Sequence, residues 1–294
     1  MHRNAVNTIL HKLSLVVAFT CSLLIITVFA FILRESLPIW QTTSPLAFLS
    51  GTEWSPVNPP FQFGIAAMLA STLWVAFGAL LIAVPLAISC AIFLAEYAPG
   101  WLARLLRPVL TIITGIPSVV YGFLGAAVLV KFFEVRFQMA SGESLFAASI
   151  VLAFMVLPYI VVNSESALRA VPEEFKLSAM ATGVSKPYVT MKVVFPLAKR
   201  GMLGSIALAF GRAAGETMAV LMIAGNVARF PTSWFSRGEP LSALIALELG
   251  SAAPHSQHYQ ALFAAGLVLI AVVTLINVSI NYLVKRNEMF KYTL

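Results

Sequence analysis

Charge is scarce in this sequence of 294 residues. Only 11% of the residues are charged, 60% are hydrophobic, and the mean hydropathy is +0.90. Soluble domains usually carry about 25% charged residues, so the composition excludes an ordinary soluble protein and indicates several membrane spans. Aspartate is absent and all 12 acidic residues are glutamate, an absence for which we have no physical explanation.

Cysteine and histidine are also rare. Cys21 and Cys90 both lie in apolar runs, so they are interpreted as small buried hydrophobic side chains rather than as a disulfide. His255 and His258 share an outer loop but have no third ligand nearby, and we expect them to be solvated rather than metal-bound. The sequence therefore predicts that this chain holds no metal and no cofactor.

Two signatures of energy use are missing as well. No G-x-x-x-x-G-K-[ST] phosphate-binding loop occurs, so the driving energy must come from another chain or from an ion gradient. An ion-driven secondary carrier commonly shows inverted repeats with paired broken helices, and none is found.

A membrane enzyme needs a cluster of catalytic groups inside the spans, where Arg212 and Glu216 are the only charged residues. The chain is therefore not expected to be an enzyme.

Long apolar runs are what the sequence has in abundance. A bilayer is crossed by about 20 apolar residues in a helix, and the first run is too long for a signal-peptide core and is read as an uncleaved span. The expected fold class is an all-α polytopic membrane protein with six transmembrane helices. We expect them at 13–33, 64–94, 108–130, 145–162, 201–224 and 261–284.

The segments between the spans differ in composition. Residues 34–62 are rich in proline and 225–258 form a second loop, and both suit the outer side. Residues 164–200 form a polar, basic loop. With both termini in the cytoplasm, 13 of the 19 lysines and arginines fall on the inner side and 5 on the outer side. The positive-inside rule then predicts cytoplasmic termini, and explains the pI of about 9.6 without a nucleic-acid partner.

The third predicted span contains the run GIPSVVYGFLG. Gly115, Pro117, Gly122 and Gly125 would let a neighbouring helix approach closely or break the helix locally. The hydroxyls of Ser118 and Tyr121 would then line a path through the membrane. Helix packing with satisfied hydroxyls explains the same pattern equally well, so both interpretations remain open.

The basic loop carries a spaced motif. LSAMATGVSKPYVTMKVVFP resembles the EAA loop of ABC importer permeases, with Ala179, Gly183 and Pro196 at the second Ala, the Gly and the final Pro. Gly183 permits a sharp turn after a short helix. The sequence departs from the motif at Leu177 and Ser178. Glu173 and Glu174, in the opening turn of the predicted helix, are then the acidic candidates for contact with an ATPase.

A second run narrows the family. FGRAAGETMAVLMIAGN, together with LAEYAPGWL and GIPSVVYGFLG, resembles the permease subunits of the phosphate-specific (Pst) ABC importer. The Gly-Glu-Thr-Met-Ala-Val run favours the C-type subunit, because the A-type partner tends to have Gly-Glu-Thr-Ala-Pro there. The resemblance extends from about residue 64 to the C-terminus. The expected domains are an N-terminal span and outer loop (1–63), a permease core (64–284) with its coupling loop (164–200), and a cytoplasmic tail (285–294).

The resemblance implies a function and partners. It implies a type I importer fold in the bacterial cytoplasmic (inner) membrane, paired with a second permease subunit as a heterodimer. A cytoplasmic ABC ATPase dimer would bind ATP and Mg, and an extracytoplasmic phosphate-binding protein would deliver the substrate. The alternative is a permease for another oxyanion, molybdate or sulfate, because these importers share the EAA loop.

The charged residues of the fifth predicted span are the candidate substrate site. Arg212 and Glu216 lie four residues apart and would share one helix face. Arg212 would offer its guanidinium to a phosphate oxyanion while Glu216 orients it, with Thr217 and Asn226 adding hydrogen bonds. A purely structural ion pair is the competing interpretation, since charges within membranes are tolerated when paired.

Overall fold

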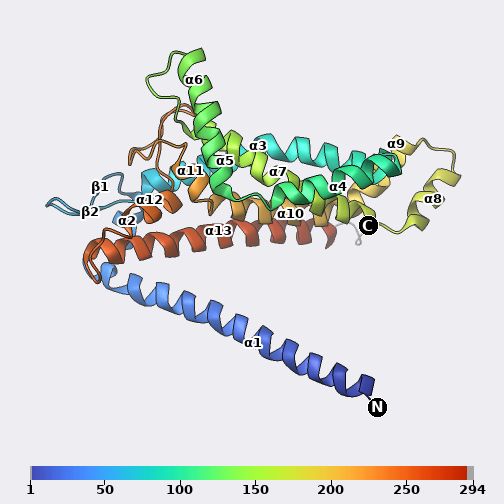
Figure 1. The fold of residues 1–294 in the computed structure, drawn as a ribbon, viewed down its shortest axis with the longest axis horizontal. Coiled ribbons are helices and arrows are strands. Elements are labelled where there is room, and N and C mark those ends of the chain that lie inside the picture. The colour runs from blue at the N-terminus through green and yellow to red at the C-terminus, as the bar shows by residue number, and fades with distance from the viewer. Residues whose placement is uncertain (1, 290–294) are drawn as a thin grey trace.

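The computed structural model describes residues 2–289 as an elongated bundle of helices (Figure 1). Six helical segments within these residues are long and apolar enough to cross a membrane, which confirms the predicted number. They are Leu10–Gln41, Ala66–Tyr97, Ser118–Arg136, Leu145–Arg169, Lys186–Ala214 and Gln257–Ile280.

The centre of the bundle is the pair formed by α3 (Ala66–Ile92) and α7 (Leu145–Arg169), against which α10 (Phe195–Ala214) packs. Small side chains repeat every three or four residues on α3, which places them on one helix face. Such a face lets neighbouring helices approach closely. Its fully buried members are Ala76, Ala79, Ala83, Ala87 and Ala91.

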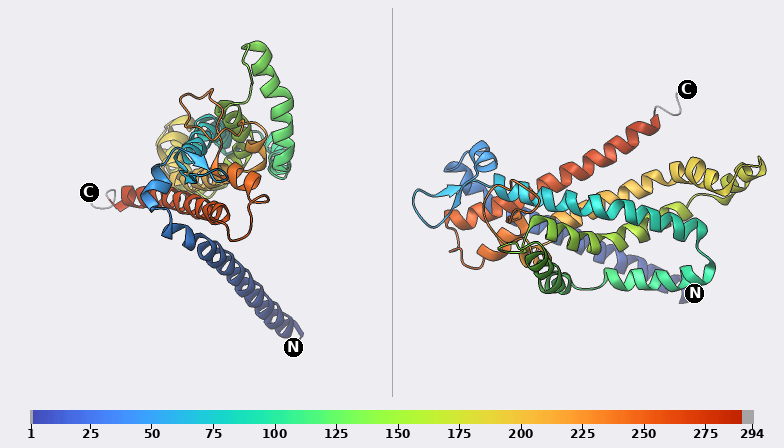
Figure 2. Two further views of the ribbon diagram at one scale, coloured as in Figure 1. Left: turned by 90° about the vertical axis from the view of Figure 1, so that its left-hand side faces the viewer. Right: turned by 90° about the horizontal axis from the view of Figure 1, so that it is seen from above.

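The first helix stands apart from this bundle. Helix α1 (His2–Ser36) diverges from α13 (Gln257–Met289) along most of its length (Figures 1 and 2). They meet where Phe31 and Phe263 pack edge to face, with ring centroids 5.5 Å apart. No residue in the most apolar stretch of α1 is buried within the chain. Most of α1 therefore contributes apolar surface and little internal packing.

The third span differs from the prediction of one helix over 108–130. Helix α4 (Gly100–Thr114) ends before Gly115, and a new continuous helix runs through α5 (Ser118–Leu124), η3 (Gly125–Val130) and α6 (Lys131–Arg136). Pro117 has no N–H to donate and disfavours helical geometry at the residue before it, so the helix breaks there. The local break suggested by the glycines and proline is confirmed, while the continuous span is wrong.

The fifth span also begins and ends earlier than predicted. Helix α9 (Lys186–Val189), η4 (Thr190–Val194) and α10 form one helix from Lys186 to Ala214, so 201–224 is wrong as a span. Only the four-residue helix α11 (Met218–Leu221) follows. Basic residues were taken to mark a loop, but the helical backbone continues through them. The non-helical part of the coupling loop is correspondingly shorter than 164–200.

The end of the bundle that carries the two predicted outer loops is an ordered layer built on its own apolar cluster. The helices η1 (Leu37–Gln41), α2 (Pro45–Ser50) and α12 (Leu241–Glu248) lie there with the antiparallel strands β1 (Trp54–Ser55) and β2 (Gln62–Phe63). Three side chains from different elements, Ile39, Phe48 and Leu241, are fully buried in the cluster. The proline-rich segment is therefore packed against the spans.

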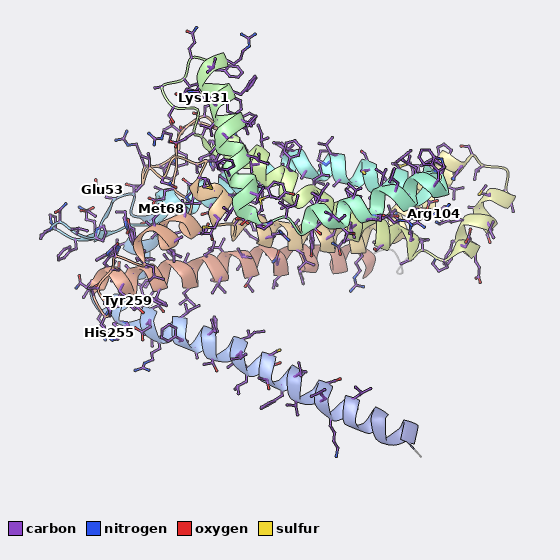
Figure 3. The ribbon with its side chains drawn as sticks, viewed as in Figure 1. Glu53, Met68, Arg104, Lys131, His255 and Tyr259 are labelled. Atoms are coloured by element: carbon purple, nitrogen blue, oxygen red, sulfur yellow. The ribbon has the colours of Figure 1, made fainter. Side chains whose placement is uncertain are left out.

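The two histidines of the second outer loop behave differently. His255 is 82% exposed, as expected for a solvated side chain, and projects at this end of the molecule (Figure 3). His258 is only 14% exposed, and its Nε2 lies 2.7 Å from Glu248 Oε2, which also accepts a hydrogen bond from Trp54 Nε1. The expectation of solvation is thus wrong for His258, because a nearby carboxylate binds it.

The second outer loop also completes the start of α7. The amides of Ser144, Leu145 and Phe146 donate to the carbonyls of Ile223, Ser236 and Trp234, at 3.1, 3.0 and 2.8 Å. The first amides of a helix have no partner within the helix, so this backbone stands in for water. The ring of Trp234 meanwhile packs over Gly78 of α3 and against Trp74.

The packing at Gly78 can be tested by Gly78→Ala. A Cβ there would overlap the Trp234 ring and come within 2.5 Å of Ser149 Oγ, and overpacking of this kind costs about 1–3 kcal/mol. We expect a lower melting temperature for the purified protein in detergent. Gly204→Ala in α10 is the matched control, because nothing lies within 4 Å of its Cβ position; equal effects of the two substitutions would contradict the packing argument.

Candidate translocation path and coupling segment

The coupling segment is helix α8 (Glu173–Ala181) with the turn that follows it. Glu173 and Glu174 lie in the first turn, and Gly183 has φ +82° just after the helix, both as the sequence predicts. Pro187 lies in the first turn of α9. Figure 1 shows α8 projecting from the end of the bundle opposite the β-strands. The fold thus presents a short helix with acidic side chains at its N-terminus.

The surface of α8 is open to a partner. No residue of α8 is buried, and large apolar side chains at Phe175, Leu177 and Met180 are 53%, 61% and 46% exposed. Of the other motif positions, Ala179 is half-buried against the core, while Pro196 lies exposed in the first turn of α10. Leu177, where the EAA motif would have Glu, thus adds apolar surface rather than charge.

Two helix breaks lie side by side in the bundle. One separates α4 from α5 and the other separates α10 from α11. A Cβ on Gly122 would be 2.9 Å from Ala219 Cα, and one on Gly125 would be 2.5 Å from Ile223. The expected close approach of a neighbouring helix at these two glycines is therefore confirmed, and the neighbour is the α11 region.

The hydroxyls predicted for the path take up different roles. Tyr121 donates its hydroxyl to the carbonyl of Ile113 at 3.0 Å, which satisfies an acceptor in the last turn of α4. Thr217 Oγ1 donates to Gly215 O at 3.3 Å. Ser118, the first residue of α5, is half-buried and makes no hydrogen bond through its side chain to any residue that the structure describes.

Arg212 and Glu216 do not share a helix face. Arg212 lies in the last turn of α10, which ends at Ala214, and Glu216 lies in the break. The Glu216 carboxylate accepts from the amide of Ala219 at 3.3 Å, and its carbonyl accepts from Ser242 Oγ at 2.7 Å. The predicted orientation of Arg212 by Glu216 is wrong in this structure, because the carboxylate caps α11.

Arg212 is left exposed and without an ion pair among the described residues. It lies close enough to Tyr121 for its charge to act on the phenol, and its position in the last turn of α10 suits the negative end of the helix dipole. A guanidinium in a span faces protein or water rather than lipid. The Arg212 surface therefore faces another subunit or an aqueous path.

Asn226, expected to add a hydrogen bond near the charges, follows the second break with φ +46°. Its Nδ2 donates to Leu221 O at 2.7 Å, which satisfies a carbonyl at the end of α11. Its Oδ1 is buried and has no partner among the described residues. The side chain therefore stabilises the local turn.

A buried charge cluster near the coupling segment was not predicted from the sequence. Glu165 is 6% exposed, and its Oε1 accepts from Arg107 Nε and from Arg169 Nε, each at 2.8 Å. The four-residue spacing of Glu165 and Arg169 was visible in the sequence as an i,i+4 pair. Arg107 comes from α4, and no local pattern could have joined it to them.

Comparison with known proteins decides the family. The protein family described as "Binding-protein-dependent transport system inner membrane component" matches residues 83–289 of the chain. The chain belongs to this family. It is a multi-pass membrane permease, and the expected type I importer fold is confirmed.

Named relatives agree with the predicted resemblance to the C-type permease. The chain is 34% identical to the phosphate transport system permease protein PstC of Pasteurella multocida, over 84% of this chain and 82% of that one. It is 30% identical to the probable PstC of Methanocaldococcus jannaschii, over 91% and 90%. It is 35% identical to the probable ABC transporter permease protein YqgH of Bacillus subtilis, over 83% and 79%.

Solved structures share the fold at lower identity. A bacterial alginate ABC transporter in complex with its alginate-bound periplasmic protein superposes with a TM-score of 0.61 and 13% identity, over 91% of this chain and 94% of that chain. The inward-facing MetNI methionine ABC transporter gives 0.55 and 20%, over 76% and 94%. These likenesses support the architecture alone.

Glu239, in the predicted second outer loop, is expected to make the stability of the protein depend on pH. It precedes the Pro240 that begins α12, it is 6% exposed, and burial together with the nearby Glu248 raises its pKa to about 7. A raised pKa favours the protonated folded form, so this contribution to stability is present below the unfolded pKa of 4.5. It is lost as the pH rises through about 7.

We therefore expect the melting temperature of the purified protein to fall between pH 5 and pH 8, and Glu239→Gln to flatten that fall. The exposed carboxylate of Glu53 provides the control Glu53→Gln, which should keep the slope. A wild-type slope retained in Glu239→Gln would show that another group is responsible.

Proposed function

We propose that this chain is the transmembrane permease subunit of an ATP-driven phosphate importer and forms half of its translocation path. The named PstC relatives support the substrate. The observation that carries the proposal is Arg212, an exposed guanidinium in the last turn of α10, at a helix break and without a partner among the described residues.

Arg212 is suited to an oxyanion at this position. A guanidinium offers several N–H donors in a planar fork that matches two oxygens of phosphate. The Glu216 carboxylate accepts from the amide of Ala219, and it forms no ion pair with Arg212 among the contacts of the described residues. The hydroxyls of Ser118, Tyr121 and Thr217 lie around the two breaks and complete a polar stretch of the path.

Energy enters, on this proposal, through the coupling segment between residues 173 and 196. A cytoplasmic ATPase dimer holds ATP and Mg and docks on α8, with Glu173 and Glu174 as acidic contacts. An extracytoplasmic phosphate-binding protein docks on the opposite end, and a second permease subunit completes the path. The beginning of α1, the end of α13 and α8 lie toward one end of the molecule (Figures 1 and 2), which fits cytoplasmic termini.

The second candidate is a permease for molybdate or sulfate, because the guanidinium fork recognises any tetrahedral oxyanion. An ion-driven carrier is the third and requires no ATPase partner. Uptake of labelled phosphate into vesicles containing this chain, its partner permease, the ATPase and the binding protein separates them. ATP-dependent uptake that resists excess molybdate and sulfate supports the proposal. Competition by either anion favours the second candidate, and uptake without ATP favours the third.

Substitution of Arg212 tests the site itself. We expect Arg212→Ala to lower phosphate uptake about 10- to 100-fold, the loss expected from hydrogen bonds to a charged group worth about 1.5–3 kcal/mol. Arg212→Lys should recover part of the rate, because it restores the charge without the fork. Arg136→Ala is the control, since Arg136 is equally exposed but lies at the end of α6. Unchanged uptake by Arg212→Ala would remove Arg212 from the path.

A further inference from the structure

The π-helical segment η2 (Phe93–Tyr97), which continues α3, contacts the coupling segment on both sides of its Gly183 turn. Glu96 Oε1 lies 2.5 Å from Lys176 Nζ of α8, and the two side chains are only 8% and 21% exposed. The next residue, Tyr97, has its hydroxyl 3.3 Å from Thr190 Oγ1 and its ring 5.2 Å from Lys186 Nζ. We call these five residues the clasp. Two consecutive side chains thus contact the helices before and after the Gly183 turn.

Few other contacts attach α8 to the spans. None of its nine residues is buried, and only Lys176 and Ala179 are even half-buried. The Coulomb attraction within an ion pair shielded from water is stronger than at the surface, where a pair typically contributes about 0–1 kcal/mol, although desolvation offsets part of this gain. The Glu96–Lys176 pair is therefore the principal polar link by which α8 displaces the rest of the chain.

The backbone at the clasp is wound differently from the helices around it. Glu96 and Tyr97 belong to the π-helical segment η2 (Phe93–Tyr97), and Thr190 begins the π-helical segment η4. Such wide turns are rare and are frequent at functional sites. The clasp therefore joins two π-helical segments, whose backbone can change to α-helical hydrogen bonding.

A second set of contacts connects η2 to α4. Arg169 donates from Nη2 to Leu94 O at 2.9 Å and from Nε to Glu165, which also binds Arg107 of α4. Arg107 Nη2 is buried and has no partner among the described residues. A buried donor without an acceptor is costly, so this cluster has a donor available for a different set of partners.

Helix α4 leads from this cluster to the candidate path. It is continuous from Gly100 to Thr114 and ends at the first break, where Tyr121 bonds back to Ile113 O. A Cβ on the next residue, Gly122, would lie 2.9 Å from Ala219 Cα, so α5 packs against the segment that follows Arg212. A displacement of η2 that moves α4 as a rigid element would therefore reach the neighbourhood of Arg212.

We propose that Glu96 and Tyr97 are positioning residues that transmit displacement of α8 through α4 to the break at Gly115–Pro117. This inference rests on the proposed function as an ATP-driven permease. A chain of contacts alone does not demonstrate coupling, which requires a measured dependence between the two ends. The assembled complex in proteoliposomes allows that measurement.

The variant Glu96→Gln removes the charge and keeps the shape of the side chain. The double variant Glu96→Lys with Lys176→Glu restores the pair with its charges exchanged. Glu134→Gln is the matched control, because Glu134 pairs with Lys131 at 2.8 Å on α6, outside the coupling segment, and its side chain is 39% exposed. For each variant we measure the phosphate transported per ATP hydrolysed. We also measure the ATP-dependent rate at which the cysteine of Thr114→Cys is labelled, in a Cys21→Ala, Cys90→Ala background.

We expect Glu96→Gln to retain the co-purifying ATPase and its ATP hydrolysis while phosphate transported per ATP falls about ten-fold, a typical size for coupling between two sites. The ATP-dependent change in labelling at position 114 should disappear in the same variant. The charge exchange should restore both readouts, and Glu134→Gln should alter neither.

Wild-type transport per ATP and wild-type labelling in Glu96→Gln would overturn the inference. Loss of the ATPase from the complex without rescue by the charge exchange would also overturn it, since Glu96 would then serve assembly only. If the wild-type complex moves no phosphate, the proposed substrate fails instead. In that case the labelling at position 114 still tests whether the clasp transmits displacement, because the labelling depends on ATP and not on the transported anion.

Discussion

Backbone hydrogen bonding in a medium without water is the constraint on which this structure depends. Inside a bilayer an unpaired amide or carbonyl costs several kcal/mol, so irregular backbone is tolerated only where it is buried in protein or lines a water-filled space. This chain has two helix breaks next to its spans, at residues 115–117 before the third span and at residues 215–217 after the fifth. Each break creates unpaired groups that side chains must satisfy.

Polar side chains near the breaks meet this demand. Tyr121 serves the carbonyl of Ile113, Glu216 the amide of Ala219, and Asn226 the carbonyl of Leu221. Residues that look like substrate ligands in the sequence are thus largely engaged with the backbone. Arg212 and Ser118 are the exceptions among the described residues, and only Arg212 carries a charge, which is why the anion role is assigned to it.

Much of the fold followed from the sequence because its physics is local. Apolar length predicts the number of spans, Gly183 predicts the turn of the coupling segment, and Pro117 predicts the break. The limits of the third and fifth spans did not follow. Basic residues such as Lys192 and Lys199 were read as loop, although a helix can continue through them.

The sequence identified candidate residues for the site but did not predict how they are arranged. Spacing placed Arg212 and Glu216 on one helix face, but the helix ends between them at Ala214, and hydropathy carries no sign of that end. Lys176, the partner of Glu96, is 80 residues away in the chain, and Arg107, one partner of Glu165, is 58 residues away. Contacts over such separations are set by the packing of α3, α4 and α7, which no short sequence pattern encodes.

The backbone pairing between the second outer loop and the start of α7 has a practical consequence for labelling this protein. Because carbonyls of Trp234 and Ser236 substitute for water at the first amides of α7, an epitope or fluorophore inserted between them would uncap a central span. The tip between β1 and β2, residues 56–60, has mostly exposed side chains, and its carbonyls cap no helix among the described residues. Reporter groups therefore belong at that tip.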